Sequence, residues 1–172
     1  MSVAESRPSV AMRLLRAFGL FEDAVLVLLL GAMIGVAGAQ IVLRNLFDGA
    51  LLWADPLLRV AVLWVGMIGA MVATRGDRQI TIDVVSRFLP DRWRAGVRVV
   101  TDLFTAAVAA AVAWSALRLV LGDKAAGGLA IAFVPVWVCE AILPVAFAVI
   151  SLRYLVYALQ HFRAFRVQEE IP

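Results

Sequence analysis

The chain has 172 residues, of which 63% are hydrophobic and 17% are charged, and its formal net charge is +3. A soluble domain carries about 45–50% apolar and about 25% charged residues, so this composition excludes an ordinary soluble protein and indicates a membrane protein. The basic balance does not indicate a nucleic-acid partner, because the arginines sit at the ends of apolar runs, as topology requires in membrane proteins. The length allows one domain over residues 1–172.

Four apolar runs predict an all-α integral membrane fold, with spans at about residues 22–44, 53–74, 97–119 and 131–157. The first run contains twenty uncharged residues, Ala24 to Leu43, which suits a hydrocarbon core of about 30 Å. Each span should be a helix, because an isolated strand cannot satisfy its backbone in lipid. In the fourth run, Pro135 and Pro144 predict a kink or a broken start.

The first run has a competing interpretation as a cleavable signal peptide. Arg13 and Arg16 precede it, and Ala37-Gly38-Ala39 resembles a cleavage site. Against cleavage, Glu22 and Asp23 stand where a basic region should meet the apolar one, and the run continues beyond the proposed site. We therefore expect the run to remain as the first span.

The basic residues sort by side of the membrane. Twelve of the 16 Lys and Arg residues precede the first span, lie between the second and third, or lie at or after the end of the fourth. The other four lie toward the opposite side: Arg44, Arg59, Arg118 and Lys124. Because positive charge accumulates in cytoplasmic segments, both termini are predicted to be cytoplasmic. Four spans also require both termini on one side.

The segment between spans two and three is the most polar stretch of the chain. Read as a helix at about residues 79–89, it places apolar residues on one broad face and an Asp83–Arg87 pair on the other. Such a helix lies in the membrane interface, and its defining residues are Ile80, Asp83, Val84, Arg87 and Phe88. The alternation from Ile80 to Val84 also fits a strand, which ranks second because it would have no partner.

Few residues could support catalysis or bind a cofactor. His161 is the single histidine and lies beyond the fourth apolar run, so paired haem ligands and His/Cys metal sites are not predicted. No glycine-rich phosphate motif appears, and no serine or cysteine has a basic partner in view. The sequence therefore predicts a protein that is not an enzyme and that carries no cofactor or metal.

Charged residues inside the apolar runs are the remaining candidates for function. Arg59 and Glu140 lie at similar depth, about 10 Å from the same end of their spans, so an ion pair between them is predicted. Asp55, four residues before Arg59, is a competing partner on the same helix face. A pair that joins two helices is favoured over an ion or substrate relay, because relays use several groups across the membrane. Asp102 is expected in an interfacial salt bridge with Arg98.

Small residues predict where helices pack closely. Gly31 and Gly35 form one such step, and Gly66 and Ala70 form another in the second run. Small residues occupy more faces than a single four-helix bundle can bury. Some of those faces are therefore candidates for contact with another membrane protein.

The order of several short motifs resembles the small membrane subunit of TRAP (tripartite ATP-independent periplasmic) transporters, the DctQ-type small permease. The resemblance covers about residues 21–157. It is carried by Trp53-Ala54-Asp55-Pro56, Leu63-Trp64-Val65-Gly66, Gln79-Ile80-Thr81-Ile82-Asp83-Val84, Val134-Pro135-Val136-Trp137 and Leu143-Pro144-Val145-Ala146-Phe147.

The resemblance implies a place in the bacterial inner membrane and two protein partners. In this family a periplasmic solute-binding protein delivers a solute, commonly an organic acid, to a large membrane subunit driven by an ion gradient. The small subunit is a scaffold for the large one. Two alternatives from other classes are a stand-alone channel or exporter that uses Glu140, and a structural or assembly subunit of another membrane complex.

Overall fold

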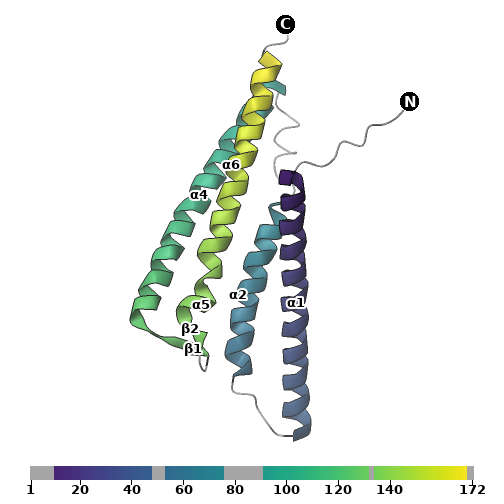
Figure 1. Ribbon diagram of the computed structural model, residues 1–172, viewed down its shortest axis with the longest axis vertical. Coiled ribbons are helices and arrows are strands. Elements are labelled where there is room, and N and C mark those ends of the chain that lie inside the picture. Colours follow the sequence, from purple (N-terminus) through teal and green to yellow (C-terminus); the bar gives the residue numbers. More distant parts are fainter. Residues whose placement is uncertain (1–9, 48–52, 76–90, 132–133, 170–172) are drawn as a thin grey trace, which may run out of the picture. The chain divides into compact units, whose positions relative to one another are not determined.

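The computed structural model describes residues 10–47, 53–75, 91–131 and 134–169. The chain divides into two compact units, Met1–Val72 and Ala73–Pro172, and long helices dominate each of them (Figure 1). Within the described residues, four helical stretches are long and apolar enough to cross a membrane: Ala17–Leu46, Ala54–Ala73, Gly96–Ala126 and Val136–Arg163. The expected all-α fold with four spans is thus confirmed, whereas the side of the termini and the single domain remain predictions.

The first unit contains α1 (Val10–Phe47) and all but the last residue of α2 (Ala54–Ala73). The 38 residues of α1 extend over about 57 Å, so the helix is longer than the hydrocarbon core and starts well before the expected residue 22. At the start of α2, the Leu57 amide donates to the Trp53 carbonyl oxygen at 3.2 Å. Gln40 Nε2 of α1 donates to Asp55 Oδ1 of α2 at 2.9 Å, which joins the two helices near the α1–α2 connection.

The second unit is built on α4 (Asp91–Ala126) and α6 (Ile142–Glu169), which lie side by side and run antiparallel (Figure 1). Small residues let the two backbones approach, because they add little bulk between helices. The contact buries Ala106 and Ala109 of α4 and Ala146 of α6. Ser151 Oγ of α6 donates to the Ala106 carbonyl oxygen at 2.9 Å, a direct bond between the helices.

The fourth span begins differently from the expectation of a helix from residue 131. Residues Leu129–Ile131 (β1) and Val134–Pro135 (β2) form a short antiparallel hairpin, followed by α5 (Val136–Glu140), a turn at Ala141, and α6. Gly127, with φ +68°, ends α4: this left-handed conformation suits glycine, and its amide donates to the Asp123 carbonyl oxygen at 3.1 Å.

The break before α6 agrees with the expected broken start. Pro144 falls in the first turn of α6, where the missing amide hydrogen of proline removes no helical bond. Pro135 is the extended residue that precedes α5. The predicted interfacial helix at about residues 79–89 lies outside the described residues.

Large apolar side chains are exposed along the helices. Examples are Leu28 at 70%, Phe104 at 69% and Leu152 at 62% exposure. An aqueous surface with this many exposed apolar groups would aggregate, so lipid or another membrane protein must cover them.

Candidate functional site

The candidate site in the second unit starts from three polar side chains of α6. Arg153, Tyr157 and His161 follow one another at intervals of four residues, a spacing that places them along one face of a helix. We call these three residues the α6 polar stripe. Each of them contacts a residue outside α6.

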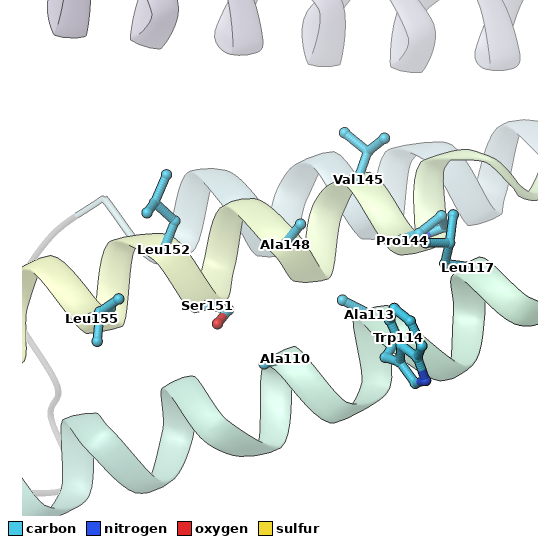
Figure 2. Close-up of a pocket in the computed structure, with 10 residues that line it drawn as sticks. All are labelled: Ala110, Ala113, Trp114, Leu117, Pro144, Val145, Ala148, Ser151, Leu152 and Leu155. Carbon is cyan, nitrogen blue, oxygen red and sulfur yellow. The ribbon is translucent and has the colours of Figure 1, made fainter.

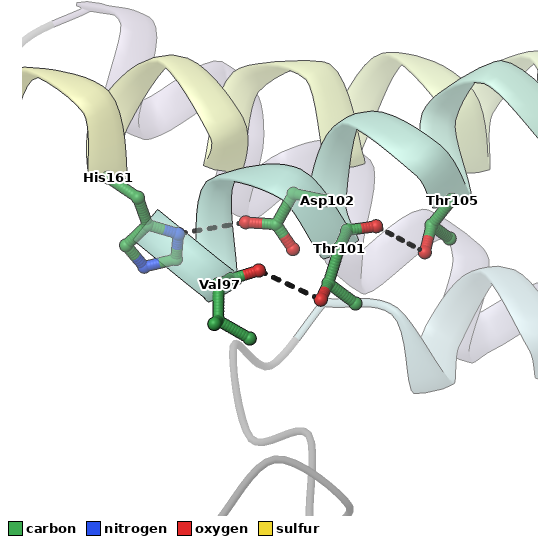
Figure 3. Close-up of polar contacts among 5 residues, drawn as sticks. All are labelled: Val97, Thr101, Asp102, Thr105 and His161. Carbon is green, nitrogen blue, oxygen red and sulfur yellow. Dashed lines mark hydrogen bonds and ion pairs between the residues drawn. The ribbon is translucent and has the colours of Figure 1, made fainter. Parts of the chain in front are cut away.

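His161 pairs with Asp102 of α4. His161 Nδ1 lies 2.8 Å from Asp102 Oδ2, and the side chains are 19% and 4% exposed, respectively (Figure 3). A carboxylate buried to this degree requires a hydrogen-bonding or charged partner, and the imidazole is that partner. Asp102, which was expected in a salt bridge with Arg98, has His161 as its partner in the structure, a residue that the sequence placed apart from the spans.

Two threonines beside Asp102 bond within their own helix. Thr101 Oγ1 donates to the Val97 carbonyl oxygen at 2.9 Å, and Thr105 Oγ1 donates to the Thr101 carbonyl oxygen at 2.8 Å (Figure 3). Threonine commonly makes such bonds inside apolar helices. These hydroxyl groups therefore bond to the backbone of α4, and the Asp102–His161 contact links α4 to α6 at this level.

The other two members of the α6 polar stripe bind the residues that follow α2. Tyr157 Oη donates to the Arg75 carbonyl oxygen at 2.9 Å and to the Thr74 carbonyl oxygen at 3.2 Å. Arg153 Nη1 donates to Thr74 Oγ1 at 3.2 Å. The stripe thus fixes both α4 and the start of the polar segment between spans two and three.

A second group of charged residues lies at the opposite end of the α4–α6 pair. Glu140 of α5 lies near Asp123 of α4, and its Oε2 atom is buried without a hydrogen bond to the described part of the chain. A buried carboxyl oxygen without a hydrogen-bonding partner is energetically costly. A cation contributed by another segment or protein would therefore suit Glu140.

The expected Arg59–Glu140 pair remains a prediction, because its two residues belong to different units. Arg59 is exposed. Asp55, the competing partner of Arg59, accepts a hydrogen bond from Gln40. No three His, Cys, Asp or Glu side chains of the described ranges gather closely enough to hold a metal ion.

The predicted packing residues present open surface. A Cβ atom added to Gly31, Gly35 or Gly66 would meet nothing within 4 Å, and Ala70 is half-buried. The interfacial residues Ile80, Asp83, Val84, Arg87 and Phe88 lie outside the described residues. The close helix contact observed in the second unit uses alanines of α4 and α6 instead.

Comparison with known proteins places the chain in a family. Residues 12–164, which include both units' membrane-spanning helices, match the model for "Tripartite ATP-independent periplasmic transporters, DctQ component". The chain belongs to the DctQ family. DctQ components are small permease subunits of the inner membrane, so this chain is a multi-pass transport component of that membrane.

A curated relative matches a part of this DctQ chain. It is the sialic acid TRAP transporter permease protein SiaT of Haemophilus influenzae (strain 86-028NP), which is 33% identical over 63 residues. The match covers 37% of this chain and 10% of the relative.

The α6 polar stripe was missed by sequence reasoning, although a signal for it was present. In an antiparallel helix pair, residues at similar distances from the connection face each other. Asp102 and His161 lie at similar distances from the hairpin that joins α4 to α6. Counting outward from a predicted turn would therefore have suggested this contact.

Proposed function

We propose that this chain is a non-catalytic scaffold for the large membrane subunit of a TRAP transporter. The complex takes up a solute by using an ion gradient, and a periplasmic binding protein delivers that solute. The solute is an organic acid, a class supported by the name of the sialic acid relative.

The scaffold role is supported by how the polar groups within the second unit's spans are used. Asp102 binds His161, Ser151 binds the backbone of α4, and Thr101 and Thr105 bind their own helix. A transport site at the midplane needs polar groups that face a substrate and helices broken at that depth. These groups instead bond within α4 or join α4 to α6, as a rigid support requires.

Contact with a large subunit is supported by the surface of α1. Gly31 and Gly35 face open space, and neighbouring side chains such as Val27 and Leu28 are 71% and 70% exposed. Glycine at such positions lets a second helix come close. Gly35→Leu should therefore weaken co-purification of the large subunit, while Leu28→Ala, about two turns away in an exposed position, should weaken it less.

Reconstitution distinguishes the scaffold from the alternatives. Liposomes containing the purified chain alone should show no uptake of organic acids under a sodium gradient. Liposomes that also contain the large subunit, supplied with the binding protein, should show uptake. Transport by the small chain alone would refute the scaffold role and favour a stand-alone channel or exporter. Failure to co-purify with a large subunit would favour a component of another complex.

The Arg59–Glu140 pair is proposed to be structural. If Glu140→Gln abolished uptake while the complex assembled normally, a relay through Glu140 would replace this role. The relay alternative takes support from the buried Glu140 Oε2 atom. Measuring uptake and assembly on the same preparation distinguishes the structural role of the pair from a relay through Glu140.

A further inference from the structure

An apolar groove runs along the surface between α4 and α6. It has a volume of about 580 Å³ and is lined by residues of these two helices (Figure 2). Small side chains, including Ala110, Ala113 and Ala148, leave the space open. Ser151 also lines the groove, but its hydroxyl group donates to the Ala106 carbonyl oxygen. The groove therefore offers an almost wholly hydrocarbon lining.

The length of the groove matches half of a membrane. Its lining on α6 extends from Pro144 to Leu155, and eleven helical rises between these two residues span about 16 Å. The hydrocarbon core is about 30 Å thick, so one leaflet accounts for about 15 Å. The groove thus suits an acyl chain from a single leaflet.

The side chain of Arg118 provides a positive charge near one end of the groove. Trp114, Leu117 and Pro144 lie together at that end (Figure 2). The guanidinium carbon of Arg118 lies 5.3 Å from the centre of the Trp114 ring, a cation–π arrangement that orients the side chain. Arg118 is exposed, so its donors remain accessible to a ligand.

The depth of Arg118 agrees with a lipid phosphate. The membrane-spanning stretch of α4, Gly96–Ala126, has 31 residues, which make a helix about 16 Å longer than the hydrocarbon core. With this excess shared between both ends, the Arg118 Cα atom lies about 4 Å inside the core boundary. An arginine side chain extends from such a depth to the headgroups, where it can bind phosphate through a planar pair of donors.

We propose that this groove binds one phospholipid, with an acyl chain between α4 and α6 and the lipid phosphate on Arg118. The lipid belongs to the leaflet at the α5 end of the pair, which is the periplasmic leaflet in the predicted topology. Its role is to fill the space between helices that small residues leave open. The site is independent of the solute and of the scaffold role.

Native mass spectrometry of the full-length chain tests the site. The delipidated protein in detergent is titrated with dioleoylphosphatidylglycerol, and with dioleoylglycerol as a ligand without phosphate. We expect one phosphatidylglycerol per chain to bind more tightly than dioleoylglycerol. Arg118→Gln should weaken phosphatidylglycerol binding about tenfold, the loss expected for a charge-assisted contact.

Matched variants separate the groove from general effects. Lys124→Gln removes a cation that also lies over a tryptophan, 5.4 Å from the Trp137 ring centre, but Trp137 does not line the groove, whereas the Trp114 ring beneath Arg118 does. Ala148→Phe fills the groove, whereas Ala107→Phe adds the same bulk at an exposed position outside it. Arg118→Gln and Ala148→Phe should weaken binding, while Lys124→Gln and Ala107→Phe should leave it unchanged.

Several results would overturn the proposal. Equal affinity of the wild-type chain for phosphatidylglycerol and dioleoylglycerol would show that the site does not recognise the phosphate group. Equal binding by Ala148→Phe and Ala107→Phe would place the lipid elsewhere. A wild-type chain that binds no lipid would indicate that a protein helix fills the groove. Melting temperatures of all variants show that they are folded.

Discussion

The two ends of the α4–α6 pair hold the same two helices together by different means. At one end, the α6 polar stripe binds Asp102 of α4 and the backbone that follows α2. At the other end, α6 begins after a hairpin and a five-residue helix, and an apolar groove opens between small side chains from Pro144 and extends along α6 as far as Leu155, beside the first residue of the stripe. Directional contacts thus fix one end, while the groove end leaves space for a hydrophobic ligand.

Buried polar bonds act more selectively than apolar packing. A carboxylate with little exposure requires a particular partner in a particular position, whereas methyl groups accept many neighbours at small cost. The polar end should therefore be the rigid one. It also holds Thr74 and Arg75, where the polar segment between spans two and three begins.

The largest expected effect concerns the side of the membrane on which each end lies. A green fluorescent protein fused after His161 should fluoresce, and alkaline phosphatase fused after Gly127 should be active. The charge distribution predicts the first position to be cytoplasmic and the second periplasmic. Alkaline phosphatase activity from a fusion after His161 would show that this end of the α4–α6 pair is periplasmic. The lipid site at the other end would then lie in the cytoplasmic leaflet.

Breaking the Asp102–His161 pair should strongly destabilise the polar end. His161→Ala leaves a carboxyl group whose side chain is 4% exposed, and loss of a partner from a buried pair costs about 3–5 kcal/mol. The free energy of unfolding of the purified chain in mixed detergent measures this loss. Arg163→Ala, an exposed control on the same helix, should have little effect.

A double variant checks the cause of that loss. Asp102→Leu combined with His161→Leu removes both polar groups and should recover most of the stability, because apolar residues can replace a buried pair. If His161→Ala were as stable as wild type, the pair would not fix α4 to α6, and the proposed contrast between the ends would fail.

Removal of the Tyr157 hydroxyl group should have a moderate effect. Tyr157→Phe loses the donor to the Thr74 and Arg75 carbonyl oxygens, which should reduce the free energy of unfolding by about 1 kcal/mol. Tyr154→Phe is the matched control, because its ring packs edge-to-face on Tyr157 and is retained. If Tyr157→Phe and Tyr154→Phe lost the same free energy of unfolding, the hydrogen bonds of the Tyr157 hydroxyl group would contribute nothing to stability beyond a general effect of removing a hydroxyl group.

The smallest expected effect comes from the Arg59–Glu140 pair. Because Arg59 is exposed, a double-mutant cycle with Arg59→Gln and Glu140→Gln should give a coupling of about 1 kcal/mol or less. The charge-reversed double variant, Arg59→Glu with Glu140→Arg, should be more stable than either reversed single variant. A coupling energy of zero would show that Arg59 and Glu140 do not interact, and Glu140 would then be expected to pair with a residue of another protein.

The broad architecture was accessible from the sequence, and the helix boundaries were not. Each predicted run contains a membrane-spanning helix, because lipid leaves the backbone no other means of bonding along an apolar segment. The helices α1 and α4 extend beyond the expected bounds, since a helix need not end where the hydrocarbon ends. The hairpin at residues 129–135 was expected to be partly helical, and it depends on pairing between two short strands.

The sequence by itself determined four membrane-spanning helices and, through the order of its motifs, the likeness to the DctQ family. These features follow from local composition, because transfer of apolar residues into lipid depends little on which neighbours they meet. Tertiary structure alone decided that Asp102 binds His161, 59 residues away, and that small residues of α4 and α6 border a groove. A hydrogen bond needs its two atoms in register at close range, and only the packing of one helix against another sets that register.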